Sequence, residues 1–313
     1  MDKSSKIYVA GHKGMVGSAI VRLLKQKGYK NIIKRTSSEL DLRNQKKVNE
    51  FFIKNNPDCV ILAAAKVGGI KANMNDLSGF LMDNLSIQTN VINAAYNYGV
   101  KNFVFLGSSC IYPKNAPQPL KEEYLLTGPL EPTNEGYAIA KIAGLKACEY
   151  YNKEHNVNYI SVMPPNLYGI NDNFNPEYSH VISGIMRRLH LAKKNNLESV
   201  EIWGSGKPYR EFMYVDDMAE GTIFLLENYK ESGFINLGVG EDVTIAELAN
   251  LIKEVVGYDG DLIFNPSKPD GMYRKLLDVT KLKKLGWTYK TSLKEGLIKT
   301  YKWYLENYGN DKI

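Results

Sequence analysis

The chain has 313 residues, of which 44% are hydrophobic and 24% charged, a composition that excludes a disordered polypeptide and predicts a sizeable core. Its net charge of +6 comes from lysines and arginines spread along the chain beside acids, so we predict an anionic small-molecule ligand and no nucleic acid partner. Three widely separated cysteines predict neither disulfides nor a metal site, and no apolar run reaches the ~20 residues of a membrane span, so we expect a soluble cytoplasmic protein.

The first predicted strand, residues 6–11, leads directly into a glycine-rich turn. Gly11, Gly14 and Gly17 follow a GxxGxxG pattern between this strand and the helix that we expect next. Glycine permits a tight turn, close approach of backbone N–H groups to a pyrophosphate and close packing of helix on strand. A glycine-rich turn without a ligand is the alternative, but a position after strand one favours a dinucleotide-binding loop.

The second predicted strand, residues 31–35, ends in cations where an NAD-binding chain usually carries an acid for the ribose 2′-hydroxyl. Lys34 and Arg35, together with Lys13 in the glycine loop, are suited to a 2′-phosphate. This pattern favours NADP(H) over NAD. The alternative is that Lys34 and Arg35 are simply solvated at a strand end.

Strands predicted at 59–65 and 102–109 continue the alternation with helices, and the second of them ends in a serine pair followed by Cys110. The run NEGYAIAKIAG then places Tyr137 and Lys141 one helical turn apart. A lysine ammonium beside a tyrosine lowers the pKa of the phenol, and Ser108 can hold a substrate oxygen opposite it. These three side chains predict proton transfer at a carbinol or carbonyl oxygen while a nicotinamide carries the hydride.

The alternation of strands and helices becomes irregular after a strand predicted at 159–169. We expect a helix near 178–195, a strand at 200–204, and helices near 216–228 and 244–256. The pattern predicts an α/β fold: a Rossmann-type doubly wound parallel sheet with a smaller C-terminal α/β substrate-binding part. We assign 1–170 to the NADP-binding domain, joined by segments near 212–240, and 171–313 mainly to the substrate-binding part.

Several motifs together resemble the GDP-L-fucose synthase family of the extended short-chain dehydrogenases/reductases. They include GHKGMVGSAI, AAAKVGGI, FLGSSCIYP, LEPTNEGYAIAKIAG, NLYG, DNFNPEYSHVI, GSGKPYREFMYVDDMA and SKPDGMYRKLLDV, and they cover essentially the whole chain. The resemblance implies an NADPH-dependent enzyme that takes a GDP-4-keto-6-deoxymannose, epimerises C3 and C5, and reduces C4. It also implies a homodimer formed through the helices that follow strands three and four.

The resemblance assigns roles to individual residues. Ser108, Tyr137 and Lys141 correspond to the reductase triad, and Cys110 and His180 to the base and acid of epimerisation. A C4 ketone acidifies the hydrogens on C3 and C5, so a thiolate and an imidazole suit this chemistry. The cofactor positions are Gly11, Lys13, Gly14, Met15, Val16, Gly17, Arg35, Asp41, Leu42, Ala64, Leu106, Gly107, Ser109, Tyr137, Lys141, Pro164, Asn166, Leu167 and His180. The substrate positions are Ser108, Arg188, Trp203, Arg210, Asp270 and Lys275.

Without the resemblance, Cys110 is equally compatible with a buried structural thiol, His180 with a polar residue at a helix start, and Trp203 with a core residue. The chain departs from the family pattern at Gly136, Pro165, Ile170, Lys207, Tyr209, Tyr214, Met272 and Tyr273. Because most of these positions adjoin predicted substrate contacts, a C4 reductase of a GDP-4-keto-heptose without epimerase activity is an alternative.

Other functions fit the residues less well. A 4,6-dehydratase would need a carboxylic acid beside the serine, where this chain has SSCIYPK. A UDP-sugar C4 epimerase would lack the cysteine and histidine pair. A non-catalytic NADP sensor would keep the glycine loop without the serine, tyrosine and lysine.

Overall fold

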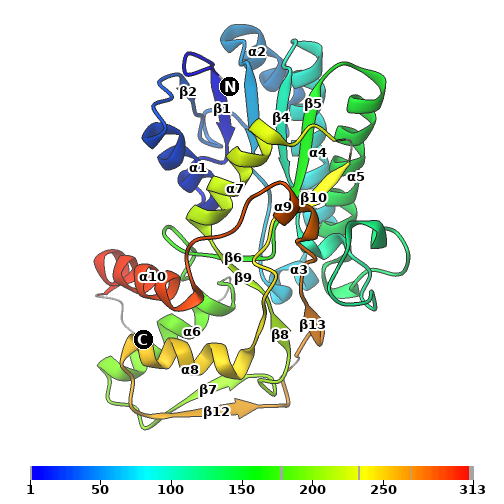
Figure 1. Ribbon diagram of the computed structural model, residues 1–313. Helices are drawn as coiled ribbons and strands as arrows, with labels where there is room; N and C mark the ends of the chain where they lie inside the picture. Colours follow the sequence, from blue (N-terminus) through cyan, green and yellow to red (C-terminus); the bar gives the residue numbers. More distant parts are fainter. Residues whose placement is uncertain (1, 177–178, 232, 269, 310–313) are drawn as a thin grey trace.

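A six-stranded sheet in which all strands run parallel forms the centre of the molecule (Figure 1). The computed structural model describes residues 2–176, 179–231, 233–268 and 270–309. The strand order is β10-β5-β4-β3-β1-β2. The strands span β1 Ile7–Ala10, β2 Ile32–Ile33, β3 Cys59–Leu62, β4 Asn102–Leu106, β5 Asn158–Met163 and β10 Phe234–Asn236. The predicted Rossmann-type α/β fold is confirmed.

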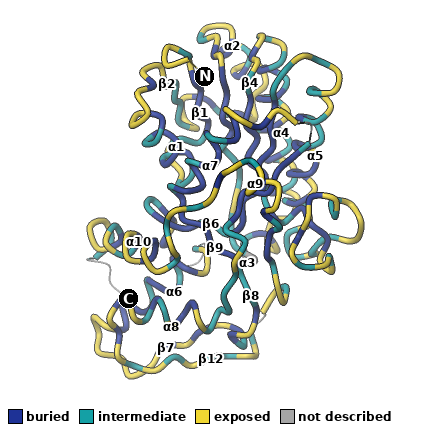
Figure 2. The backbone as a smooth tube through the Cα atoms, viewed as in Figure 1, coloured by how far each residue is buried: buried dark blue, intermediate teal, exposed yellow. Residues whose placement is uncertain are grey.

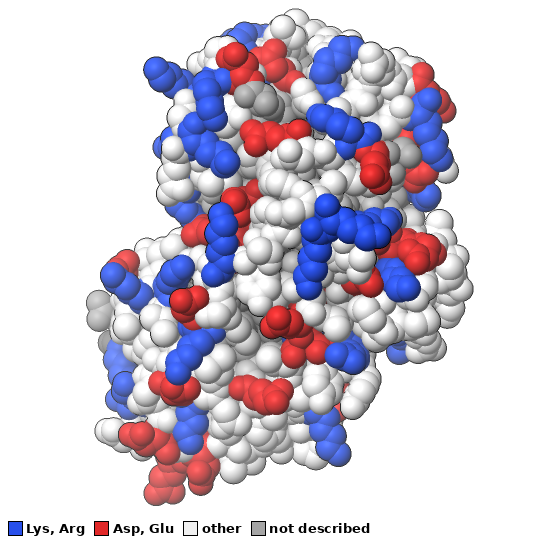
Figure 3. Space-filling view, viewed as in Figure 1, with Lys and Arg blue, Asp and Glu red and all other residues white. Residues whose placement is uncertain are grey.

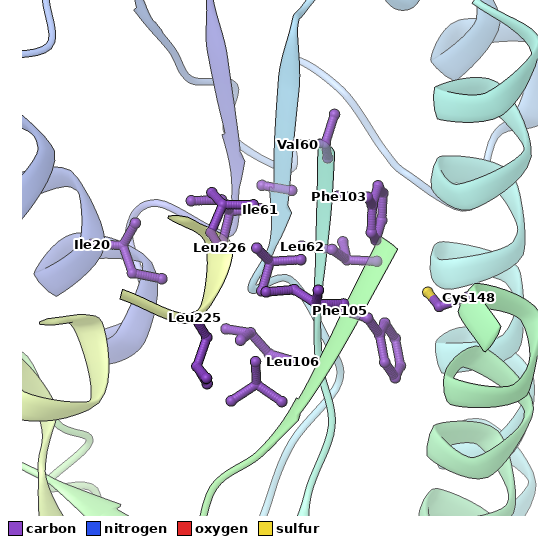
Figure 4. Close-up of a cluster of buried hydrophobic side chains, with 14 of the residues drawn as sticks. Ile20, Val60, Ile61, Leu62, Phe103, Phe105, Leu106, Cys148, Leu225 and Leu226 are labelled. Atoms are coloured by element: carbon purple, nitrogen blue, oxygen red, sulfur yellow. The ribbon is translucent and has the colours of Figure 1, made fainter. Parts of the chain in front are cut away.

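The central strands are short apolar runs, as expected for parallel strands covered on both faces. IYVA of β1 and CVIL of β3 are buried along their whole length, and Figure 2 shows the centre of the sheet as the most buried part of the chain. Helices α1 (Met15–Gln26) and α7 (Val215–Asn228) pack together on one face, and α4 (Leu77–Asn97) and α5 (Glu135–Glu154) on the other. Figure 4 shows this core, with labelled residues Ile20, Val60, Ile61, Leu62, Phe103, Phe105, Leu106, Cys148, Leu225 and Leu226.

The single strand predicted at 159–169 is wrong, because two prolines divide it. Pro164 and Pro165 have no backbone N–H to donate to a neighbouring strand. The chain therefore leaves the main sheet after β5 and forms β6 (Asn166–Tyr168), which pairs in parallel with β9 (Phe212–Tyr214). The carbonyl of Pro164 accepts a hydrogen bond from the backbone N–H of Ser109 at 3.2 Å.

The second half of the chain builds a smaller unit with its own apolar core. It contains α6 (Val181–Lys194) and α8 (Ile245–Val256), which pack against each other, the parallel pair β7 (Ser199–Trp203) and β12 (Asp261–Asn265), and α10 (Leu293–Tyr308). A three-stranded sheet combines β11 (Val243–Thr244), β8 (Tyr209–Arg210) and β13 (Arg274–Lys275). The remaining short elements are α2 (Gln45–Asn55), α3 (Ile70–Asn75), α9 (Thr280–Lys284) and three 3₁₀ turns at Ser109–Ile111, Glu122–Tyr124 and Pro132–Asn134.

The helices predicted in the second half are present with slightly different limits. Those near 216–228 and 244–256 are α7 and α8; the one near 178–195 is α6, although its expected first residue, 178, lies outside the described residues. α7 and β10 return to the main sheet, where β10 pairs with β5. The assignment of 1–170 and 171–313 to two domains, with 212–240 joining the first, stays a prediction.

Glu211 lies at the junction between the two units and is fully buried. Its carboxylate accepts hydrogen bonds from the backbone N–H groups of Val239 at 2.5 Å, Gly240 at 2.9 Å and Leu277 at 2.8 Å. Burial raises the pKa of this carboxyl to about 7, although the three donors act in the opposite direction. The Glu211 side chain thus connects the start of β9 to the segment after β10 and to the segment after β13.

Two surface features concern possible environments of the protein. Among the described residues, no helix has both the length and the apolar character needed to cross a membrane. On the face in Figure 3, cationic and anionic side chains are interspersed over both units.

Candidate active site

A groove of about 930 Å³ runs along the first half of the main sheet, at the end of β1 and beside the glycine loop. The following predicted cofactor positions line it: Gly11, Lys13, Gly14, Met15, Val16, Gly17, Arg35, Asp41, Leu42, Ala64 and His180. The sequence had placed these residues on separate segments, and the fold brings them to one cavity.

The glycine loop closes tightly because side chains are missing at two points. Gly11 has φ +82°, and a Cβ there would lie 2.7 Å from the backbone nitrogen of Ala64. A Cβ on Gly17 would collide with the carbonyl oxygen of Gly11 and lie 2.9 Å from the Cα of His12. The start of α1 therefore packs directly on the turn after β1, and its N-terminus faces the groove, the arrangement that holds a pyrophosphate. The residues present fit a dinucleotide.

The lining of the groove includes the cationic residues Arg35 and Lys13. Lys34 does not line the groove among the described residues; its carbonyl accepts a hydrogen bond from Arg35 Nη1 at 2.7 Å. Asp41 is paired with Arg43 through N–H···O distances of 2.9–3.0 Å, so its negative charge is compensated. Arg35 and Lys13 make this groove suited to an extra phosphate.

A second cavity of about 250 Å³ lies beside the groove and shares Met15, Val16 and His180 with it. It is lined by predicted catalytic and cofactor positions: Leu106, Gly107, Ser108, Ser109, Cys110, Tyr137, Lys141, Pro164, Asn166 and Leu167. Lys275, predicted as a substrate contact, also lines it. The residues come from the end of β4, the start of α5, the β5–β6 turn, the start of α6 and β13. We call this second cavity the catalytic pocket.

Tyr137 and Lys141 point from the first turns of α5 into the catalytic pocket. Lys141 Nζ donates a hydrogen bond to the carbonyl oxygen of Leu106 at 2.8 Å, and burial lowers its pKa to about 8. Burial and negative charge at Cys110 raise the pKa of Tyr137, and a hydrogen bond with Ser108 offsets only part of this rise. We expected Lys141 to lower the pKa of the Tyr137 phenol. This expectation is wrong, because burial raises that pKa, and Tyr137 is held as a phenol.

Cys110 is surrounded by hydrogen-bond donors. Its Sγ accepts from Asn134 Nδ2 at 3.2 Å and from Lys275 Nζ at 3.3 Å, while its backbone N–H donates to Ser108 Oγ at 3.2 Å. Burial alone would raise the pKa of the thiol, but the Lys275 charge and these donors outweigh it, and the net pKa is lowered. The thiol is thus prepared to act as a base.

His180 occupies the N-cap position of α6, where its side chain makes no capping hydrogen bond, and it lines both cavities. Burial lowers its pKa, so the neutral imidazole is favoured near neutral pH and the protonated form is a stronger acid than histidine in water. The pocket therefore contains two groups suited to proton transfer: the Cys110 thiol, whose pKa is lowered by nearby donors, and the His180 imidazole, whose pKa is lowered by burial.

Four other predicted substrate contacts, Arg188, Trp203, Arg210 and Asp270, lie in the smaller unit, outside the lining of both cavities. Arg188 Nη1 donates to the carbonyl of Glu201 at 2.8 Å, and Trp203, two residues further along β7, is 57% exposed. Arg210 Nη2 donates to the carbonyl of Asp270 at 3.3 Å. Arg210 is therefore beside Asp270, and Arg188 is beside the strand that ends in Trp203.

Sequence reasoning missed two residues that position the site. Asn134 precedes α5 as its N-cap yet donates to Cys110 instead of capping the helix. Asn171 has φ +69° and its Nδ2 donates to the carbonyl of Lys13 at 2.7 Å, so it links the smaller unit to the glycine loop. Asn134 was visible as the first letter of NEGYAIAKIAG, whereas nothing in the sequence marks the contact of Asn171.

Comparison with known proteins gives consistent matches. Residues 7–238 match the NAD dependent epimerase/dehydratase family. The chain is 59% identical to a putative GDP-L-fucose synthase 2 of Arabidopsis thaliana, with 98% of this chain and 94% of that protein covered. It is 52% identical to the GDP-L-fucose synthase of Escherichia coli, covering 96% and 97%. A solved structure of a Campylobacter jejuni GDP-mannoheptose C4 reductase with NADP bound superposes with a TM-score of 0.90 at 40% identity, covering 97% and 99%.

Replacing Gly17 by alanine should weaken both the fold and cofactor binding. The added methyl group forces α1 away from the Gly11 carbonyl, and such overpacking costs about 1–3 kcal/mol. Gly14→Ala is the matched comparison, because its Cβ would meet only the Gly11 oxygen at 3.5 Å, an ordinary contact. We expect Gly17→Ala to lower the urea midpoint and the NADPH affinity measured by fluorescence titration, with Gly14→Ala close to wild type in the urea midpoint. Equal urea midpoints for the two variants would contradict the packing argument.

Proposed function

The chain belongs to the GDP-L-fucose synthase family within the NAD dependent epimerase/dehydratases, and on this premise we propose that it is an NADPH-dependent C4 reductase of a GDP-4-keto sugar that also epimerises C3 and C5. One observation carries the proposal. Ser108, Cys110, Tyr137 and Lys141 line a single pocket that shares residues with a dinucleotide-shaped groove. This arrangement allows two kinds of chemistry on one sugar.

Reduction uses the end of β4 and the start of α5. Ser108 Oγ holds the C4 oxygen, and the Tyr137 phenol gives its proton to that oxygen as the carbonyl becomes a carbinol. The raised pKa of Tyr137 keeps the proton in place until negative charge develops on the oxygen. Lys141 fixes the local geometry through the Leu106 carbonyl. Bound NADPH would supply the hydride.

Epimerisation uses the other side of the pocket. The Cys110 thiolate takes a proton from the carbon next to the ketone, which leaves an enolate at C4, and His180 returns a proton on the opposite face. Ser108 would hold the enolate oxygen as well as the ketone oxygen. The raised acidity of protonated His180 suits the second step.

Nucleotide recognition is assigned to the smaller unit. Arg188 and Arg210 are suited to the diphosphate because a guanidinium donates two parallel hydrogen bonds. Trp203 is an exposed aromatic residue at the end of β7, and the carbonyl of Asp270 holds the Arg210 guanidinium. These four roles are proposals that follow the family assignment.

A GDP-4-keto-heptose is the second candidate substrate. Pro165, one of the departures from the family pattern, lines the catalytic pocket and therefore bears on the sugar that fits. The similar C. jejuni protein of known structure is described as a GDP-mannoheptose C4 reductase. The 4,6-dehydratase, the UDP-sugar epimerase and the NADP sensor receive no comparable support, because Ser108, Cys110, Tyr137 and Lys141 are gathered in one pocket.

We further propose that the protein is a homodimer that works in the cytoplasm. The predicted interface is the pair α4 and α5, which pack on each other on one face of the sheet and carry exposed apolar side chains. Met82 on α4 is 58% exposed, and Ile139 and Tyr150 on α5 are 43% and 52% exposed. The cytoplasmic location rests on the sequence alone.

The activity is tested by mixing the protein with NADPH and a GDP-4-keto-6-deoxymannose and following loss of cofactor absorbance. We expect turnover with this sugar to exceed that with a GDP-4-keto-heptose. A preference for the heptose would favour the alternative substrate, and no oxidation with either sugar would refute the reductase.

Tyr137→Phe should separate the two half-reactions. Without the phenol proton, reduction should fall by about 10²- to 10⁴-fold, the usual contribution of a positioned acid. In D2O with NADP⁺ present, deuterium should still enter C3 and C5 of the keto sugar, because Cys110 and His180 are unchanged; mass spectrometry and NMR read this exchange. Cys110→Ala is the converse control, with exchange lost. Full reduction by Tyr137→Phe would rule out its role as proton donor.

Dimerisation should be visible in solution without any ligand. We expect light scattering to give twice the 35.3 kDa mass of the chain, and Met82→Glu to shift the protein toward monomer, because a charge in an apolar interface is costly. Ile53 on α2 is 64% exposed and lies outside the proposed interface, so Ile53→Glu is the control. A wild-type monomer at micromolar concentration would contradict the proposal.

A further inference from the structure

The Cys110 sulfur accepts hydrogen bonds from two nitrogen donors. Lys275 Nζ lies 3.3 Å and Asn134 Nδ2 3.2 Å from Sγ. A thiol is a weak acceptor, whereas a thiolate accepts several N–H donors and gains Coulomb energy from an ammonium. The surroundings of the sulfur therefore favour the thiolate form of Cys110.

The ammonium of Lys275 is held in place by the backbone around it. Lys275 pairs with Arg210 in the parallel register of β13 and β8. Directly after it, the N–H of Leu276 donates to Gln118 Oε1 at 2.9 Å, and that of Leu277 to the Glu211 carboxylate at 2.8 Å. Within the described part of the chain, Lys275 forms no ion pair with a carboxylate. Its charge is thus available to the sulfur.

From this geometry we propose that Lys275 is a positioning residue that keeps Cys110 as the resting thiolate, with Asn134 as the second donor. Lys275 acts through Cys110 and needs no contact with the reacting carbons. The inference deepens the proposed epimerase half-reaction and rests on the role of Cys110 as its base.

Other groups facing the sulfur act in the same direction or are compensated. Arg210 on β8 interacts electrostatically with Cys110, which adds positive charge. Tyr137 on α5 stays a phenol, because burial and, to a smaller extent, negative charge at Cys110 raise its pKa. Lys141 and His180 line the same pocket; Lys141 donates to Leu106, and burial favours neutral His180. Among the described residues, no carboxylate lines this pocket to oppose the ammonium.

The other two cysteines show what burial does without a cation. Cys59 in β3 and Cys148 in α5 are 1% and 0% exposed, and burial raises the pKa of each to about 12. Cys110 differs by its two donors. One chain therefore contains both the activated thiol and two unactivated references.

The pH dependence of alkylation tests the proposal without substrate or cofactor. The folded protein is treated with iodoacetamide from pH 5.5 to 9.5, and modification of each cysteine is followed by mass spectrometry. We expect Cys110 to react with a midpoint below the ~8.5 of a free thiol, and Cys59 and Cys148 to stay unmodified. Lys275→Met should raise the midpoint by about one to two pH units, because it removes an opposite charge within reach of the sulfur. Lys275→Arg should restore it.

Lys283→Met, on the exposed surface of α9, is the matched control and should leave the midpoint unchanged. A change of packing alone would alter the limiting rate at high pH without moving the midpoint. The proposal is overturned by a wild-type midpoint at or above that of a free thiol, a result that needs no variant to fold, or by an unshifted midpoint in Lys275→Met. If the proposed sugar chemistry fails while the midpoint is low and depends on Lys275, the thiolate pair stands and only its assigned reaction is lost.

Discussion

The buried carboxylate of Glu211 is the interaction on which the arrangement of the site depends. Its three backbone donors come from two segments far apart in the chain, 239–240 and 277, while its own backbone carbonyl accepts from Asn166 N. An unsatisfied buried carboxylate is costly, so all three segments must come together. This junction fixes β13 beside β8, and with β13 it delivers Lys275 to Cys110. A single interior acceptor thus connects the smaller unit to the catalytic pocket.

Burial alone would give the pocket one uniform effect, raising the pKa of acids and lowering that of bases. That effect is seen at Lys141, Tyr137 and His180, where burial is the largest cause. Cys110 departs from it because an ammonium and an amide donor face the sulfur. The pKa values of two neighbouring acids are therefore shifted in opposite directions, that of the Tyr137 phenol upward and that of the Cys110 thiol downward. An enzyme that donates a proton to one atom and removes it from another needs this separation.

The order of strands and helices and the clustering of the glycine loop, the serines and the YxxxK pair were predictable from sequence, because local period and short motifs determine them. The partners of Cys110 were not. Lys275 lies 165 residues from Cys110 and reaches it only through the β8–β13 pairing. Gly136 shows the converse error. As a departure next to Tyr137 it suggested a change in the sugar pocket, but a Cβ there would lie 2.7 Å from the Leu77 carbonyl, so the glycine lets α5 approach α4. Tyr214, another departure, is buried in the core of the smaller unit.

The electrostatic link between Cys110 and Tyr137 bears on the order of the two reactions. Epimerisation needs the C4 ketone, since reduction removes the acidity of the hydrogens on C3 and C5. While Cys110 is a thiolate, its charge raises the pKa of Tyr137 and makes the phenol a weaker acid. When the sulfur takes up a proton from the sugar, its negative charge passes to the enolate and is lost when the carbon is reprotonated; the phenol then gives its own proton more readily. The thiolate that we propose for Cys110 thus opposes proton donation by Tyr137 until the sulfur has accepted a proton, which is the order that the carbonyl chemistry requires.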